Sequence, residues 1–173
     1  MENITSTPSF SRWLRQLCFL PFHRRTRWLT SSAKQALSQR IFEAEQGHFG
    51  EIYLIIENKL PLDSAYRQGC RERALALFAS HHVWDTQENT GILIYINLCE
   101  KDLEIIADRG INQKAQQDYW QALCQHTLTT FQAGDMQLGI EALIDELGAL
   151  LRTHYPNHDC HGNELPNTPK HLK

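Results

Sequence analysis

The sequence has little that would place it among membrane-spanning or exported proteins. No run reaches the ~18 apolar residues that a helical membrane span needs. The best candidate for a cleavable signal, residues 14–22, contains Arg15, Gln16 and Pro21 and has no clear apolar centre. We therefore expect a chain that stays in the cytoplasm.

Cysteine pairs and cysteine-based motifs are also missing. The chain has five cysteines, an odd number, and no CxxC motif: Cys18, Cys70, Cys99, Cys124 and Cys160. This pattern argues against a disulfide framework and favours unpaired, reduced thiols.

The familiar catalytic and ion-binding signatures are absent as well. There is no Asp-x-Asp, no glycine-rich phosphate loop and no EF-hand spacing. If the chain hydrolyses phosphate esters, the remaining route is metal-assisted attack by water.

Charge is unevenly distributed along the chain. Residues 1–40 carry seven basic side chains and one acid, a net of +6, whereas the rest carries ten basic and nineteen acidic side chains, a net of −9. An acidic main domain argues against a nucleic-acid partner. We divide the chain into a basic and aromatic N-terminal arm (1–30), a domain (31–156) and a flexible tail (157–173).

The pattern of apolar residues predicts the order of the elements in the domain. Apolar runs indicate strands over 51–57, 92–98 and 103–107, and residues at helical spacing indicate helices over 33–46, 63–81, 113–131 and 135–151. A strand–helix–strand unit favours parallel pairing of the first two strands, and a tight turn pairs the third antiparallel. The predicted fold class is α/β, a three-layer α/β/α sandwich with a small mixed sheet.

Polar residues converge where this hairpin opens. Asp85, Glu88 and Asn89 precede its first strand, and Asp108, Arg109 and Asn112 follow its second. Oxygen ligands suit Ca²⁺ or Mg²⁺, so Asp85, Glu88, Asn89 and Asp108 form a candidate metal site. The alternative is structural, with Asp85 and Asn89 shaping turns and Asp108 capping a helix.

Three further groups have both structural and functional interpretations. Arg67, Arg71 and Glu72 suggest a solvated helix face. In the alternative, Arg71 or Arg73 reaches the acidic loop before the hairpin as a structural ion pair. The tail histidines and cysteine could bind zinc or copper or be solvated: His154, His158, Cys160, His161 and His171. The aromatic residues and arginines of 10–29 could contact an anionic membrane, or pack on the domain or on a protein partner.

The segments of residues 33–155, in their order and spacing along the chain, resemble the TPM domain family. Within this family they resemble the bacterial members without a signal peptide. The resemblance rests on GEIYLIIE (50–57), RERALALF (71–78), VWDTQENTGILIYI (83–96), EIIADRGI (104–111) and FQAGDMQLGIEALIDELGALL (131–151). It implies an α/β/α sandwich. It also implies the activities described for some plant members, acid phosphatase and calcium binding.

These observations give two functional hypotheses. The first is a non-enzymatic cytoplasmic binding or adaptor module with an unidentified protein partner, a membrane contact through residues 10–29 and a divalent cation at the hairpin mouth. The alternative is a weak metal-assisted acid phosphatase that uses Asp85, Asp108 and Arg109.

Overall fold

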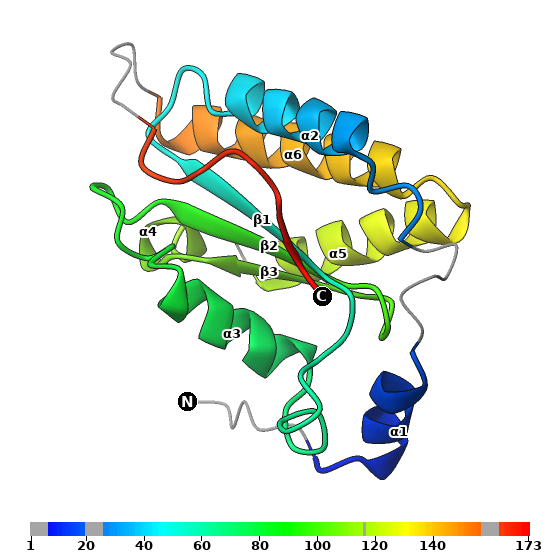
Figure 1. Ribbon diagram of the computed structural model, residues 1–173. Coiled ribbons are helices and arrows are strands. Elements are labelled where there is room, and N and C mark those ends of the chain that lie inside the picture. Colours follow the sequence, from blue (N-terminus) through cyan, green and yellow to red (C-terminus); the bar gives the residue numbers. More distant parts are fainter. Residues whose placement is uncertain (1–6, 20–25, 116, 157–162) are drawn as a thin grey trace.

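Three apolar segments form three adjacent strands of one mixed sheet (Figure 1). The computed structural model describes residues 7–19, 26–115, 117–156 and 163–173. Strands β1 (Glu51–Glu57) and β2 (Gly91–Asn97) pair in parallel, and β3 (Asp102–Ala107) pairs antiparallel with β2. This is the predicted arrangement. The sheet order is β3-β2-β1-β4, which leaves β3 at one edge.

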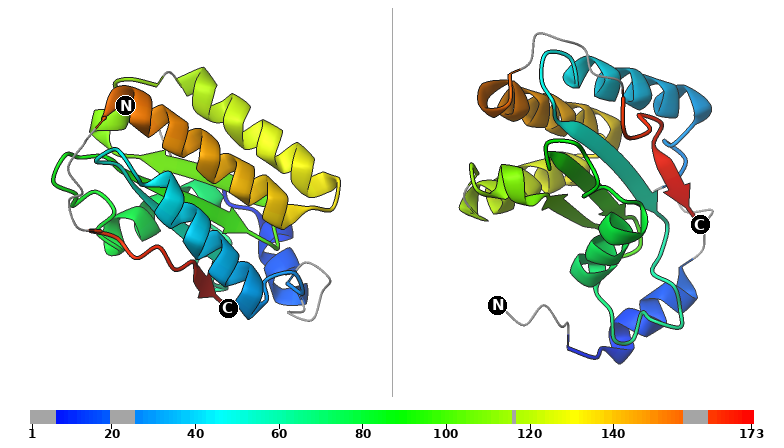
Figure 2. Two further views of the ribbon diagram at one scale, coloured as in Figure 1. Left: turned by 90° about the horizontal axis from the view of Figure 1, so that it is seen from above. Right: turned by 90° about the vertical axis from the view of Figure 1, so that its left-hand side faces the viewer.

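Helices cover both faces of this sheet, which confirms the predicted three-layer α/β/α class. The described helices are α1 (Phe10–Cys18), α2 (Ser31–Ala44), α3 (Cys70–Ser80), α4 (Arg109–Asn112), α5 (Gln117–Gln132) and α6 (Met136–His154). Helices α2, α5 and α6 lie side by side on one face, and α3 lies on the other (Figures 1 and 2). In the described ranges, none of the helices combines the length and the apolar character that crossing a membrane requires.

Alternation along the strands divides the core into two clusters. Ile52, Leu54 and Ile56 of β1 belong to the cluster under α2, α5 and α6, whereas Tyr53 and Ile55 belong to the cluster that includes α3. Successive strand side chains point to opposite faces, so a strand that is apolar throughout needs cover on both.

Helix α3 begins later than its sequence pattern predicts. Gly69 is the N-cap, and its backbone N–H donates to the Glu72 carboxylate at 3.0 Å. The preceding residues form turns, in which Ala65 N donates to Pro61 O at 2.8 Å. The predicted helix over 63–81 is therefore wrong in its first turns, because a capping interaction starts the helix at Cys70.

The prediction of a loosely ordered tail is wrong for residues 163–173. Strand β4 (Lys170–Leu172) pairs in parallel with β1, and the His171 ring hydrogen-bonds Asn58 Oδ1 at 2.8 Å. His154 is exposed at the end of α6. The remaining candidate tail ligands, His158, Cys160 and His161, lie outside the described residues.

Two glutamates, Glu51 at the start of β1 and Glu45 at the end of α2, accept hydrogen bonds from neighbouring segments. Glu51 accepts hydrogen bonds from the backbone N–H groups of Glu164 (3.3 Å) and Leu165 (3.2 Å), which fastens the tail to the sheet. Glu45 accepts one from Ile52 N at 2.9 Å. Burial raises the pKa of Glu45 from 4.5 to about 8, and the nearby Glu51 carboxylate contributes.

This raised pKa makes the free energy of unfolding depend on pH. Between about pH 4.5 and pH 8 the folded chain retains a proton on Glu45 that the unfolded chain has lost, so stability falls as pH rises through this window. Glu45→Gln keeps an acceptor for Ile52 N and cannot ionise. We expect the variant to match the wild type near pH 4 and to exceed it by several kcal/mol, up to about 5, at pH 9 in urea unfolding. A difference that does not change with pH would contradict the assignment.

Candidate functional site

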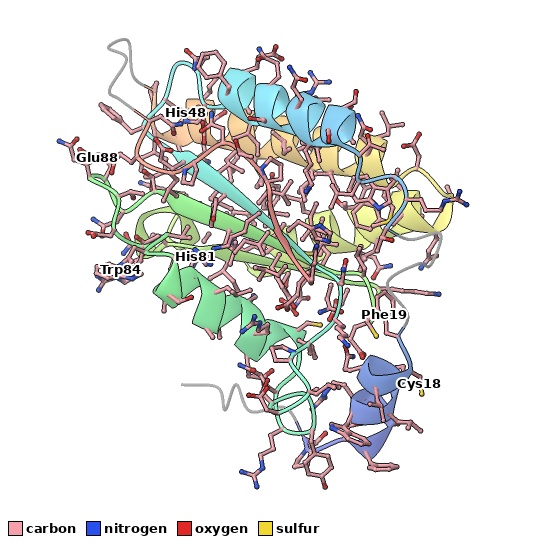
Figure 3. The ribbon with its side chains drawn as sticks, in the orientation of Figure 1. Cys18, Phe19, His48, His81, Trp84 and Glu88 are labelled. Atoms are coloured by element: carbon pink, nitrogen blue, oxygen red, sulfur yellow. The ribbon has the colours of Figure 1, made fainter. Side chains whose placement is uncertain are left out.

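The loop between α3 and β2 carries the first group of predicted ligands. Asp85, Glu88 and Asn89 are all exposed, and Glu88 points away from the domain at the loop tip (Figure 3). The loop is shaped by hydrogen bonds within it: Asp85 N donates to His82 O at 2.9 Å, and Thr90 N donates to Thr86 Oγ1 at 2.9 Å. Asn89 has φ of 55°, a left-handed conformation that asparagine tolerates.

Asp108 differs from these residues because it is buried. Its side chain is 7% exposed, and Oδ1 accepts from Arg109 N at 2.6 Å as the N-cap of α4. Its second oxygen, Oδ2, is buried without a hydrogen-bond partner among the described residues. A buried carboxylate oxygen without a donor is costly, so Asp108 is suited to contact a ligand.

The loop and α4 meet through their backbones. A Cβ built on Gly110 would lie 2.6 Å from Asn89 O and 3.4 Å from Glu88 O. Glycine is needed here because the loop carbonyl groups pack directly on α4. The structure therefore packs Gly110, two residues after Asp108, against backbone oxygens of the loop, while the Asp85 and Glu88 side chains stay exposed.

The predicted metal ligands consequently do not assemble as a set of side chains. Within the part of the chain that the structure describes, no group of three or more His, Cys, Asp or Glu residues is placed to hold a metal ion. Binding of Ca²⁺ or Mg²⁺ near Asp108 stays a prediction, with backbone carbonyl groups in place of some of the expected carboxylates.

Asp108 and Arg109 line a groove along the free edge of β3. The groove has a volume of about 770 Å³, and residues of α3 and α5 form its walls. A second hollow of about 550 Å³ shares Asp102, Gln125 and Leu128 with it and extends past the start of β3. Figure 1 shows β3 at the sheet edge between α3 and α5.

Side chains cap part of the free strand edge inside this groove. Arg71 donates to Ile105 O at 3.0 Å and to Glu104 Oε2 at 3.2 Å, and Asn112 donates to Ala107 O at 2.5 Å. Such capping protects an edge strand from uncontrolled pairing. Arg71 therefore forms an ion pair although it is exposed, but with Glu104 of β3 and not with the acidic loop that the sequence suggested as a partner.

Two residues that line the groove each carry a buried polar atom without a partner, and the two atoms are of opposite kind. Trp120 Nε1, a donor, is buried without a partner among the described residues, as is the acceptor Asp108 Oδ2, and both residues line the groove. The third such atom, Trp28 Nε1, belongs to a residue outside the groove lining. A donor and an acceptor that both lack a hydrogen-bond partner, on residues lining one groove, favour a polar ligand there.

Sequence reasoning identified Asp108 and Arg109 but missed Trp120. Tryptophan in an amphipathic helix predicts a core position, and nothing in its spacing indicates that the indole N–H lacks a partner. The groove thiol, Cys124, has its pKa raised to about 11 by burial. A thiol that is protonated near neutral pH is a poor nucleophile.

Comparison with known proteins agrees with the architecture. The family model described as the TPM domain matches residues 24–150. The NMR structure of the BA42 protein from the psychrophilic bacterium Bizionia argentinensis is similar, with 26% sequence identity and a TM-score of 0.73, over 83% of this chain and 95% of that one. No curated protein matches the sequence. The chain belongs to the TPM domain family.

Proposed function

We propose that this TPM-domain protein is a non-enzymatic binding module whose ligand is an extended segment of a partner protein, held in the groove along β3. The observation that carries the proposal is that two residues lining this groove each carry a buried polar atom without a hydrogen-bond partner, Asp108 Oδ2 and Trp120 Nε1. A peptide unit offers one N–H donor and one C=O acceptor, which are the two groups that this pair lacks.

The walls of the groove support the same ligand class. Leu75 and Phe78 of α3 and Leu128 of α5 are half-buried and line it, so they leave apolar surface for a side chain of the ligand. Arg109 is exposed at the Asp108 end and forms no ion pair within the described ranges, which suits an acidic residue of the ligand. Strand β3 has six residues, so an extended ligand alongside it would span about 20 Å.

We propose that the module acts in the cytoplasm. In the described ranges Cys18, Cys70 and Cys124 are free thiols, as expected in a reducing compartment.

Selection from displayed random peptides tests the proposal. Peptides enriched on the wild-type chain are measured against Asp108→Asn, which keeps a capping oxygen, and against Trp120→Phe, which removes only the indole donor from an otherwise aromatic side chain. We expect each variant to weaken binding about tenfold or more. Leu138→Ser, on the exposed face of α6, is the control and should change nothing. Enriched peptides that bind both groove variants as tightly as the wild type would refute the proposal.

A divalent cation is the second candidate ligand, favoured by the open Asp108 oxygen beside the loop carbonyl groups. Such a cation would make the runner-up function possible, a metal-assisted phosphatase that uses Asp85, Asp108 and Arg109. Release of phosphate from p-nitrophenyl phosphate with added Mg²⁺ or Ca²⁺ tests it. Metal-dependent turnover that disappears in Asp85→Ala would support the phosphatase, and absence of turnover in the wild type would exclude it under those conditions.

A further inference from the structure

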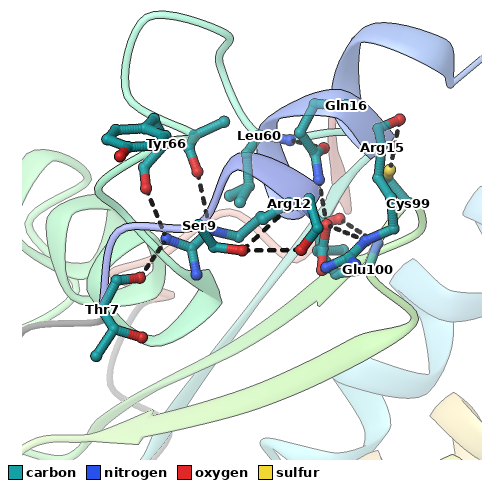
Figure 4. A network of polar contacts seen from close by, with 12 residues as sticks. Thr7, Ser9, Arg12, Arg15, Gln16, Leu60, Tyr66, Cys99 and Glu100 are labelled. Atoms are coloured by element: carbon teal, nitrogen blue, oxygen red, sulfur yellow. Dashed lines mark hydrogen bonds and ion pairs between the residues drawn. The ribbon is translucent and has the colours of Figure 1, made fainter.

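Helix α1 is attached to the domain by its polar side. Arg12 donates to Ala65 O at 2.8 Å, Tyr66 O at 3.1 Å and Thr7 O at 3.3 Å (Figure 4). These partners are backbone carbonyl groups, so they satisfy the guanidinium donors without neutralising its charge.

The next turn of α1 continues this polar attachment. Arg15 pairs with Glu100 at 2.6 Å, and Gln16 is fully buried between Glu100 and Leu60, whose backbone N–H donates to Gln16 Oε1 at 2.8 Å (Figure 4). Gln16 also donates to Glu100. A buried amide with partners on both ends fixes the rotation of the helix about its axis.

This rotation presents apolar side chains to solvent. Phe10, Leu14 and Leu17, at positions i, i+4 and i+7, are 65%, 44% and 49% exposed. Trp13 stacks on Phe10, with ring centroids 5.6 Å apart. Trp13 packs partly against the core of the domain. A helix on a protein surface normally buries its apolar residues, but the outer side of α1, defined here as Phe10, Leu14 and Leu17, stays exposed and needs another partner.

Shape, area and charge together favour one partner. The outer side belongs to a single nine-residue helix that projects from the sandwich (Figures 1 and 2). Three side chains supply far less than the ~800 Å² per partner that a stable dimer buries. Residues 7–19 contain two arginines and no acid, within a first 40 residues of net charge +6. A projecting apolar ridge on a segment of net positive charge suits the interfacial region of an anionic bilayer.

We infer that α1 binds the surface of an anionic lipid bilayer through Phe10, Leu14 and Leu17 while its polar side stays hydrogen-bonded to the domain. This inference is independent of the groove, since α1 contributes no residue to the groove lining.

Flotation of the full chain with vesicles tests the inference. The vesicles are phosphatidylcholine with phosphatidylglycerol, or phosphatidylcholine alone. We expect the wild type to float with the anionic vesicles and much less with the neutral ones. The triple variant Phe10→Ser, Leu14→Ser, Leu17→Ser should bind the anionic vesicles at least about tenfold more weakly than the wild type.

The matched control replaces exposed apolar residues elsewhere. Phe42 on α2 and Leu138 on α6 are 53% and 55% exposed, and the double variant Phe42→Ser, Leu138→Ser should float like the wild type. Thermal unfolding of each variant checks that the fold is intact. The inference is overturned if the wild type does not float with anionic vesicles, or if the triple variant floats equally well. It is also overturned if light scattering shows that the wild type forms a dimer that the triple variant cannot form.

Discussion

Replacing Gly91 by alanine is expected to destabilise the fold by about 3 kcal/mol or more. A Cβ at this position would lie 1.8 Å from Val83 O and 3.0 Å from Val83 C, which are backbone atoms of a fully buried residue. Because Val83 begins the loop that carries Asp85, relief of the overlap requires the loop to move away from β2. Urea unfolding measures the loss.

Gly134 offers a matched control for this substitution. It has φ of 101°, and a Cβ added there would meet no atom within 4 Å, so alanine adds backbone strain of about 1 kcal/mol without a collision. Equal losses for Gly91→Ala and Gly134→Ala would mean that the loop does not rest on Gly91 as described.

Replacing Arg73 by methionine is expected to cost about 3–5 kcal/mol of stability. Its guanidinium donates through Nε and Nη2 to the Glu57 carboxylate, with the shortest contact at 2.6 Å. Glu57 is 2% exposed and also accepts from Tyr95 Oη at 2.6 Å. Methionine keeps much of the apolar stem and leaves Glu57 as a buried charge without its cation, which urea unfolding would register.

Two further variants separate this buried pair from a general effect of lost charge. Arg71→Met breaks the more exposed pair with Glu104, whose side chains are 45% and 22% exposed, and should cost about 1 kcal/mol or less. Adding Glu57→Gln to Arg73→Met should restore much of the lost stability, because no charged carboxylate then stays buried without a cation. If Arg73→Met costs no more than Arg71→Met, the buried pair does not stabilise the sheet as described.

The central sheet could be predicted from the sequence because burial on both faces leaves a direct signal. The runs Glu51–Glu57 and Gly91–Asn97 are nearly all apolar, and the short turn before β3 leaves antiparallel pairing as the simple solution. Strand β4 carries no such signal. Its Lys-His-Leu sequence is half-buried, and its pairing depends on contacts with β1 from more than 100 residues earlier in the chain.

The candidate site could be predicted only in part, for a related reason. Asp108 and Arg109 follow a predicted strand, so the topology places them at one end of the sheet. The groove, however, is assembled from α3, β3 and α5, and no local pattern predicts that Trp120 Nε1 lacks a partner. The exposure of Phe10, Leu14 and Leu17 on α1 could not be predicted either. It depends on hydrogen bonds from Arg12 to the distant carbonyl groups of Ala65 and Tyr66.

A peptide ligand in the groove is best tested by NMR of the ¹⁵N-labelled chain, which resolves backbone amides and indole N–H groups. The probe is N-acetyl-leucine N-methylamide, which carries peptide N–H and C=O groups beside one apolar side chain. Ca²⁺ and Mg²⁺ are titrated separately. The chain has four tryptophans, and Trp120→Phe identifies the indole signal of Trp120.

We expect the probe to shift the Trp120 indole signal together with the Arg109 amide, whose N–H is bonded to Asp108. A cation at Asp108 would shift the Arg109 amide and leave the indole signal in place. If the probe moves neither signal while Ca²⁺ or Mg²⁺ moves the Arg109 amide, the groove is not a peptide site and the divalent cation becomes the ligand to pursue.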